Sequence, residues 1–381
     1  MRTLSEKTSR TWLKPQYGLS LIELMISITI GLLILVSMSS MFINQSRARA
    51  ELDKTNRMID NGRYATELLS ENLKLAGFYG SFVPQGVATV LYDPCSIPTL
   101  LNPALNLDLL RLHVQGYDAA TANSQIANPP CALTNVAGSA ESLKPGSDVL
   151  AIRRTSTLEL PQAATVLQAA APNNGTIYLQ ASTCQHDSPT TPYQISSNTA
   201  ALNLGQRNIS TPTPDYPAAP YNNCVTLPGG VPSIVAPFAS LRAVLVEVYF
   251  VSPNNNLGDG IPTLKRRELT VNGGLPQFVT TPLVEGVEFM QVEYGLDTDG
   301  DGSPDSYVSC AACTLNQWAS VVSVNLNLLT RNVDETRSYS DKKTYTLGLA
   351  GTVGPLNDRY KRHVFTQLIR LTNPAGRREQ P

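Results

Sequence analysis

The amino-acid sequence predicts an α+β fold in which one long N-terminal helix packs on an antiparallel β-sheet. Three observations support this prediction. A run of apolar residues from Leu19 to Ile43 contains no proline, and helical periodicity continues beyond it to Ala76. From about residue 147 onward the chain contains several short segments rich in β-branched and aromatic residues. Only 15% of the residues are charged, while Gly and Pro number 25 and 27, which favours strands and loops over a helical bundle.

The charge distribution predicts an exported protein. Residues 1–18 have a net charge of about +3, because four basic residues stand against Glu6, and the remainder of the chain is net acidic. By the positive-inside rule, the short basic segment stays in the cytoplasm and the remainder is exported. The whole chain has a formal net charge of −1, and its aromatic residues do not alternate with basic clusters. A nucleic-acid partner is therefore not expected.

The apolar run Leu19–Ile43 is predicted to be a retained membrane anchor. At about 1.5 Å per helical residue, it is long enough to cross roughly 30 Å of hydrocarbon. The sequence after it, "NQSRARAELDKTNR", offers no small-residue cleavage site of the secretory type. The helix is expected to continue to Ala76, where Gly77 serves as the residue after the C-cap.

Four segments follow from this interpretation. Residues 1–18 form a cytoplasmic leader, and residues 19–43 form a transmembrane helix. Residues 44–80 form the amphipathic continuation of that helix, with an apolar stripe at a spacing of three to four residues. Residues 81–381 form an exported, β-rich head domain.

Glu23 is the single carboxylate within the apolar run. An unpaired carboxylate in hydrocarbon costs a few kcal/mol or more, so it requires a partner or an escape to water. One interpretation is that Glu23 pairs with a positive charge on a neighbouring chain and sets the register of assembly. The other is that Glu23 reaches the membrane interface from near the end of the helix.

All six cysteines lie in the exported part of the chain. Their even number fits disulfides in an oxidising compartment, although connectivity does not follow from sequence. Proximity along the chain favours three local pairs. These are Cys95–Cys131, Cys184–Cys224, which would close a Pro-rich loop, and Cys310–Cys313.

The "CAAC" segment at Cys310 and Cys313 has three interpretations: half of a zinc site, a redox pair or a short structural disulfide. A zinc site needs a second pair of ligands at matching spacing, and the sequence contains none. A thioredoxin-type motif opens a helix after a strand, whereas this segment is expected to precede a strand directly. The local disulfide is therefore favoured.

Seven segments of the head have the character of strands. The clearest alternates Val322, Val324, Leu326 and Leu328 with polar residues. The predicted strands are Ser147–Ser156, Thr176–Ser182, Leu241–Ser252, Leu264–Val271, Gly286–Leu296, Trp318–Arg331 and His363–Asn373.

The segment "DTDGDGSPD" has the carboxylate spacing of a calcium loop. Asp297, Asp299, Asp301 and Asp305 occupy positions 1, 3, 5 and 9, and Gly302 occupies position 6, where the chain turns sharply. The twelfth position is valine rather than glutamate, which excludes an EF-hand, so a Ca²⁺ site here would need another ligand. The alternative interpretation is an exposed acidic turn between two strands.

The N-terminal sequence "GLSLIELMISITIGLL" resembles the type III signal of type IV pilins and pseudopilins. The basic leader ending in Gly18, the glutamate at the fifth mature position and the uninterrupted apolar helix all agree with that family. The resemblance implies that prepilin peptidase cleaves between Gly18 and Leu19 and that the new terminus at Leu19 is N-methylated. It also favours pairing of Glu23 with the terminus of a neighbouring subunit. Ser40 stands where many major pilins have a helix-bending proline, which argues against a major pilin.

The C-terminal third is similar to PilW-type minor pilins. The similarity rests on "LVEGVEFMQVEYGLDTDGDGSPDSY", "WASVVSVNLNLLTR", "YTLG" and "NDRYKRHVFTQLIRLTN", together with the early "NGRYATELLSENLKLAGFYG". It covers Gly18–Gly80 and about Pro282–Asn373. It implies a pilin-like α+β head with long disulfide-pinned loops. The implied function is that of a minor pilin in a complex that primes pilus growth or sits at the pilus tip, supporting twitching motility or adhesion.

The same resemblance implies the partners and location of the chain. The implied partners are other minor and major pilins, prepilin peptidase and the inner-membrane pilus assembly machinery. The chain would span the inner membrane once, with its head in the periplasm, and would then enter a pilus at the cell surface.

Two alternatives remain open from the sequence. One is a pseudopilin of type II secretion, which shares the N-terminal signal. The other is a membrane-anchored periplasmic domain with catalytic or calcium-binding activity. His113, His186 and His363 match no ligand or triad spacing, and no hydrolase, zincin or Walker motif is present. An enzyme is therefore not expected.

Overall fold

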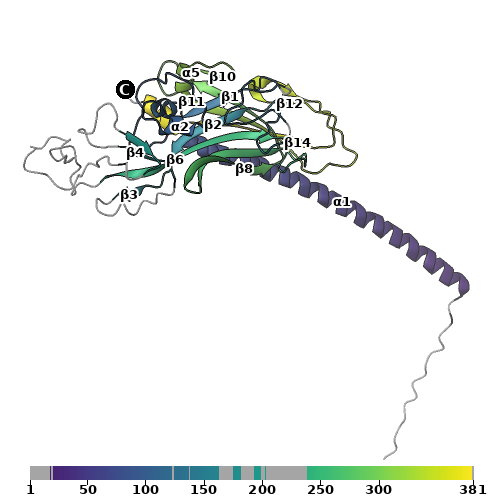
Figure 1. The fold of residues 1–381 in the computed structure, drawn as a ribbon. Coiled ribbons are helices and arrows are strands. Elements are labelled where there is room, and N and C mark those ends of the chain that lie inside the picture. The colour runs from purple at the N-terminus through teal and green to yellow at the C-terminus, as the bar shows by residue number, and fades with distance from the viewer. Residues whose placement is uncertain are drawn as a thin grey trace, which may run out of the picture. The chain divides into compact units, whose positions relative to one another are not determined.

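The computed structural model describes residues 18, 20–121, 124–136, 138–162, 175–181, 193–198, 202 and 238–379. Contacts within the chain divide it after Asp53 into two units. The long helix α1, Leu21–Lys74, crosses that boundary (Figure 1). Among the described residues, α1 is the one helix that is long and apolar enough to cross a membrane.

The first unit contains the apolar half of α1. Its large apolar side chains are exposed, from Leu21 at 78% to Ile43 at 48%. The predicted first residue of the helix, Leu19, lies outside the described residues. The predicted end at Ala76 is two residues too late, and Gly77 adopts a positive φ of 70°, as a residue after a C-cap does.

The second half of α1 belongs to the core of the head. Its buried residues recur every three to four positions, so that one face of the helix packs inward. They are Met58, Gly62, Ala65, Leu69, Ser70 and Leu73.

The larger sheet of the head is antiparallel and has eight described strands. Five of them follow the order β1-β2-β6-β4-β5, β3 pairs with β6, and β7 pairs with both β6 and β8. Their bounds are β1 Val114–Tyr117, β2 Val149–Thr155, β3 Leu160–Gln162, β4 Tyr178–Ala181, β5 Tyr193–Ser196, β6 Phe238–Ser252, β7 Thr263–Asn272 and β8 Leu275–Glu285.

The second sheet has the order β10-β9-β11-β14 and is also antiparallel. Its strands are β9 Val287–Leu296, β10 Ser306–Val308, β11 Val321–Arg331 and β14 Arg362–Arg370. The short strands β12 Tyr345–Thr346 and β13 Thr352–Val353 form a separate pair. The short helices are α2 Ile97–Leu101, α3 Asn106–Arg111, α5 Leu315–Ala319, η2 Gly348–Ala350 and α6 Thr372–Arg378.

One hydrophobic core holds α1 against both sheets. Leu69 of α1 belongs to the same buried cluster as Leu150 and Tyr249 of the eight-stranded sheet and Val292 and Leu326 of the four-stranded sheet. Every one of these side chains is at most 1% exposed. Burial of these apolar side chains is the main contribution to the stability of the head.

The predicted α+β class, with a long helix and antiparallel strands, is confirmed. The single predicted sheet is wrong, because the strands divide between two main sheets. The expected strand start at Trp318 is also wrong. Thr314 caps a short helix by bonding to Gln317, and Gln317 bonds back to the Thr314 backbone, which places Trp318 in α5. Most of the stretch 184–237, where long loops are expected, lies outside the described residues, but its described part contains the short strand β5.

Candidate functional site

The predicted processing signal lies at the start of α1. Gly18 is exposed, and Leu19 lies outside the described residues. Glu23 stands in the first turn, and its Oε2 accepts the backbone N–H of Ser20 at 3.0 Å. A carboxylate in this position satisfies one of the donors that the first turn of a helix leaves free. Pairing of Glu23 with a neighbouring chain stays a prediction.

Two disulfides connect described residues of the head. Cys95 bonds to Cys131, and Cys310 bonds to Cys313, with Cα–Cα distances of 5.0 and 4.7 Å. These are two of the three pairs that the sequence predicts. Cys184 and Cys224 lie outside the described residues.

The setting of the Cys310–Cys313 pair differs from the expectation. The pair follows β10 and precedes α5, so a strand does not follow it directly. Both cysteines contact the main core, and Cys310 is only 8% exposed. The disulfide therefore closes a tight turn over the core next to the capped start of α5.

The acidic loop brings three of its four predicted carboxylates together. One oxygen from each of Asp297, Asp299 and Asp301 lies within 4.8 Å of the others. Asp305 instead accepts the backbone N–H and the hydroxyl of Thr298, at 2.7 and 2.6 Å. The prediction that all four side chains surround one ion therefore differs from the structure at Asp305.

Asp297 already has partners within the protein. Its carboxylate accepts the backbone N–H groups of Gly300 at 2.6 Å and Gly302 at 3.0 Å, and Arg378 Nη1 lies 3.3 Å away. Burial alone would raise the pKa of Asp297, but these N–H donors and the Arg378 charge together lower it. The arginine charge also competes with any cation that the loop would bind.

Three clustered carboxylates suit a hard cation such as Ca²⁺, which takes six to eight oxygen ligands. The structure brings together one oxygen from each of the three carboxylates, so carbonyls or water would have to supply the remaining ligands. A structural constraint accounts for Gly302 without a metal. Its φ is 85°, and an added Cβ would lie 2.8 Å from the carbonyl oxygen of Ala375 on α6. Calcium binding stays a prediction.

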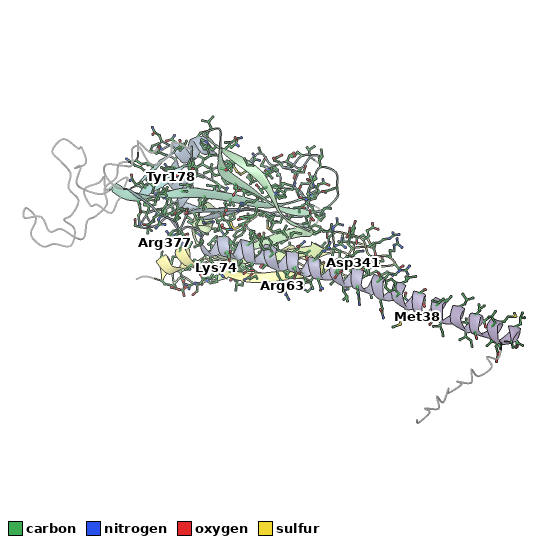
Figure 2. All side chains as sticks on the ribbon, turned by 90° about the horizontal axis from the view of Figure 1, so that it is seen from below. Met38, Arg63, Lys74, Tyr178, Asp341 and Arg377 are labelled. Carbon is green, nitrogen blue, oxygen red and sulfur yellow. A yellow bond between two sulfur atoms is a disulfide. The ribbon has the colours of Figure 1, made fainter. Side chains whose placement is uncertain are left out.

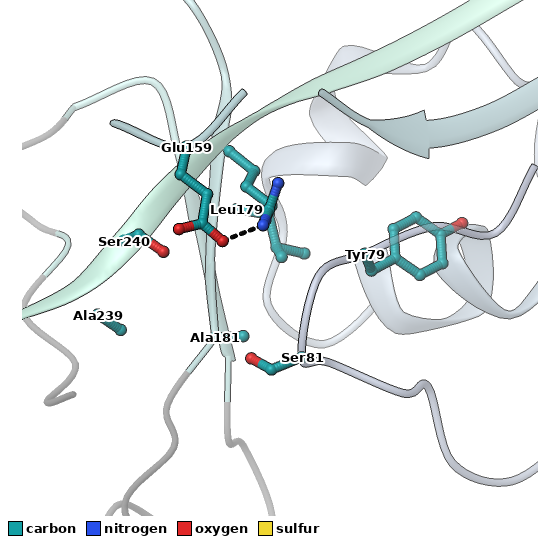
Figure 3. Close-up of a pocket in the computed structure, with 8 residues that line it drawn as sticks. Tyr79, Ser81, Glu159, Leu179, Ala181, Ala239 and Ser240 are labelled. Carbon is teal, nitrogen blue, oxygen red and sulfur yellow. Dashed lines mark hydrogen bonds and ion pairs between the residues drawn. The ribbon is translucent and has the colours of Figure 1, made fainter. Parts of the chain in front are cut away.

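Figure 3 shows a polar pocket of about 180 Å³ beside β4 and β6. Arg242 forms an ion pair with Glu159 within it and also donates to the carbonyls of Ser156 and Thr157, at 3.0 and 2.8 Å. Ser240 contributes a hydroxyl to the lining. The one positively charged side chain of the pocket is therefore already paired within the pocket.

The two described histidines have packing roles. His113 is buried, and its Nε2 lies 2.7 Å from the carbonyl oxygen of Val321, so Nε2 carries the proton. Burial lowers the pKa of His113 to about 4. The ring of His363 packs edge-on against the ring of Phe365. His186 lies outside the described residues.

Two comparisons identify what the chain resembles. The prokaryotic N-terminal methylation motif matches residues 13–39, which include Gly18, Leu19 and Glu23. This match defines the class: a protein with a prepilin-type signal on an apolar N-terminal helix. The family described as Type IV Pilus-assembly protein W matches residues 248–373.

The two matches confirm the PilW-type resemblance and the prepilin-type signal. The PilW match begins in β6, before the region around Pro282 where the sequence similarity was expected to start. It therefore includes β7 and β8 as well as the whole four-stranded sheet. No curated protein and no solved structure matches the chain.

Proposed function

We propose that this chain is a minor pilin that takes part in type IV pilus assembly, within a complex that primes fibre growth or sits at the fibre tip. The matches support a protein of the type IV pilus, and the priming or tip role is the further step proposed. One observation carries the proposal. The same chain combines the methylation motif at the start of α1 with a PilW match over residues 248–373.

The chain's architecture suits this function. Cleavage after Gly18 would leave Leu19 as a methylated terminus followed by an exposed apolar helix. Such a helix is stable in hydrocarbon and, after extraction, in a bundle of similar helices. Glu23 would then neutralise the terminal amine of a neighbouring subunit in the low-dielectric core and set its register. The buried second half of α1 ties the head to this helix.

The proposed partners are other minor and major pilins, prepilin peptidase and the inner-membrane assembly machinery. The head would lie in the periplasm before the chain enters the fibre. We infer a structural role rather than an enzymatic one. A type II secretion pseudopilin would share the N-terminal signal, and the match to Type IV Pilus-assembly protein W favours the pilus.

Processing provides the direct test. Mass spectrometry of the protein recovered from sheared fibres should find a terminus at methylated Leu19. Gly18→Leu should block cleavage, because the peptidase must accommodate a small residue next to the bond that it cuts. Gly31→Ala is the matched control, since the added Cβ would meet nothing within 4 Å apart from the adjacent backbone of its own helix, and it should be processed normally.

Two outcomes would contradict the proposal. An uncleaved Met1 terminus in assembled fibres would contradict the pilin interpretation. Absence of the chain from purified fibres of a piliated cell would contradict its incorporation into the fibre.

Glu23→Gln keeps the side-chain shape without the charge. It should be processed but poorly incorporated, which separates signal recognition from subunit registry.

A further inference from the structure

A pocket of about 220 Å³ lies where α6 meets the end of α3 and the loop that follows α1. Arg377 and Arg378 of α6 and Arg111 of α3 line it, and buried His113 forms part of its wall. Figure 2 labels Arg377, and α6 is the yellow helix of Figure 1. No residue of the predicted sites lines this pocket, although Arg378 contacts the acidic loop on its other side.

The arginines of the pocket outnumber the acids that contact them. Arg111 pairs with Asp108 at 3.0 Å, and Arg378 pairs with Asp297 at 3.3 Å. Arg377 has no carboxylate within ion-pairing distance in the described part of the chain. A partly buried positive charge without a counter-charge is costly, so it favours an anion from outside.

Backbone carbonyls orient the guanidinium of Arg377. Its Nε donates to the carbonyl of Asn373 at 3.1 Å, and its Nη2 donates to the carbonyl of Gly77 at 3.3 Å. These bonds fix the plane of the group, and Nη1 has no acceptor among the described residues. An oriented guanidinium with free donors is suited to a carboxylate, which accepts charge-assisted hydrogen bonds at its two oxygens.

The lowered pKa of His113 agrees with an excess of positive charge in the pocket. Burial is the largest cause of its lowered pKa, and the charges of Arg377, Arg378 and Arg153 lower the pKa further. The ring is therefore neutral at pH 7, with Nε2–H bonded to Val321. It adds no charge to the pocket, so the net positive charge there comes from the arginines.

Apolar side chains are exposed around this charged centre. Val83 and Val87 line the pocket and are 41% and 55% exposed, and nearby in sequence Val90 and Leu91 are both 44% exposed. Arg111 holds this segment in place by donating to the carbonyls of Gln85 and Val87, at 2.7 and 2.9 Å. An apolar rim of this kind favours an acid carried among apolar side chains over a free inorganic anion.

We propose that this pocket binds a carboxylate of a partner protein chain, with Arg377 as its main ion-pairing residue and Val83 and Val87 contacting the apolar neighbours of the acid. Under the function proposed above, the partner is an adjacent subunit of the pilus. The inference rests on that function only for this choice of partner.

The test is protection of individual arginines from a 1,2-dicarbonyl reagent, read by peptide mapping on the full chain in detergent. The probe is N-acetyl-Val-Glu-Val-amide, compared with the Gln peptide of the same shape and with inorganic phosphate at equal ionic strength. The Glu peptide should slow modification of Arg377 about twofold at the concentration that half-fills the site. The Gln peptide should not. Arg359, which is 66% exposed and does not line the pocket, is the internal reference.

Variants distinguish the contribution of the arginine charge to binding from that of the apolar rim. Arg377→Gln should abolish the protection of Arg378 by the Glu peptide, whereas Arg359→Gln should leave it unchanged. Val83→Ser with Val87→Ser, both at exposed positions, should weaken protection by the Glu peptide but not by phosphate. Circular dichroism of each variant checks that the head is folded.

Several outcomes would overturn the proposal. Equal protection by the Glu and Gln peptides would show that the carboxylate is not recognised, and protection by phosphate alone would assign the pocket to small inorganic anions. Absence of protection by every probe would leave the arginines with a purely structural role. The assay needs neither processing nor fibres, so its failure is distinguishable from failure of the proposed pilus function.

Discussion

Gly62 of α1 lies directly against the aromatic ring of Phe365 on β14. A Cβ added at position 62 would lie 2.6 Å from Phe365 Cδ2 and closer still to other ring atoms. The absence of a side chain therefore lets the helix backbone approach the edge strand of the four-stranded sheet. This contact joins residues about 300 positions apart and fixes how the second half of α1 packs in the head.

Gly62→Ala is expected to destabilise the head. Alanine improves helix propensity by about 1 kcal/mol, but overlap with the Phe365 ring should cost about 1–3 kcal/mol and outweigh the gain. Thermal unfolding of the full chain followed by circular dichroism measures the balance. In the double variant with Phe365→Leu, the melting temperature should recover part of the loss. A melting temperature for Gly62→Ala at or above the wild-type value would show that the ring moves aside freely.

Arg362 is the centre of a buried ion cluster. Its side chain is 0% exposed, and it contacts Glu288 at 2.5 Å, Asp341 at 2.8 Å and Asp358 at 2.5 Å. Burial opposes its charge, but these three carboxylates together raise the pKa of Arg362 above its usual value. The guanidinium connects β14 to β9 and to the loop before β12.

Arg362→Met is expected to destabilise the head by about 3–5 kcal/mol, because Asp341 would remain buried without its cation and Glu288 would keep only Arg331, whose Nε lies 3.9 Å away. Chemical denaturation of the variant gives the change in free energy of unfolding. Arg359→Met is the matched control. Its ion pair with Glu335 is exposed and should be worth less than about 1 kcal/mol. Similar denaturation midpoints for the two variants would mean that water or other cations compensate for the missing guanidinium.

Local features of the fold were predictable from the sequence, whereas long-range features were not. The apolar run and the periodicity of α1 are local patterns, so the long helix was predictable to within two residues at its C-terminal end. The alternation in β11 likewise identified a strand directly. The division of strands between two sheets was not predictable, because it depends on pairings such as that of β6 with β2, about 90 residues apart.

The candidate sites show the same limit. The spacing of Asp297, Asp299 and Asp301 predicted a cluster, since residues two apart in a tight loop converge. Asp305 was assigned to the same cluster, but its bond to Thr298 depends on the local turn geometry. No signal in the sequence indicated the pocket lined by Arg111 and Arg377, because most of the sequence of the head lies between these two residues.

Stability is expected to depend on the protonation of His113. Its pKa is about 4 in the folded protein and about 6.5 when unfolded, so the unfolded chain binds the proton first as the pH falls. The free energy of unfolding therefore decreases as the pH is lowered from 6.5 toward 4, by about 2 kcal/mol at pH 5. The groups that face the ring, Arg153, Arg377 and Arg378, keep their charge throughout this range.

His113→Gln isolates that contribution, since the amide can still donate to the Val321 carbonyl but does not titrate. The difference in free energy of unfolding between the wild type and this variant should shrink or reverse between pH 7 and pH 5. Other titrating groups, including buried Asp148, affect both proteins alike and cancel in the difference. A difference that stays constant over this range would show that His113 is already accessible to protons in the folded chain.

Calcium is expected to stabilise the loop that carries Asp297, Asp299 and Asp301. An ion that binds the folded loop better than the unfolded chain raises stability by linkage, and the few side-chain ligands suggest affinity no tighter than millimolar. The full chain should therefore melt at a higher temperature in millimolar calcium than in chelator. Asp299→Ala with Asp301→Ala should remove the difference. Asp305→Ala should keep it, because Asp305 bonds to Thr298 outside the cluster. If the melting temperature of the wild type does not respond to calcium, the loop is only an acidic turn. If Asp305→Ala abolishes the response, Asp305 turns toward the ion when calcium binds.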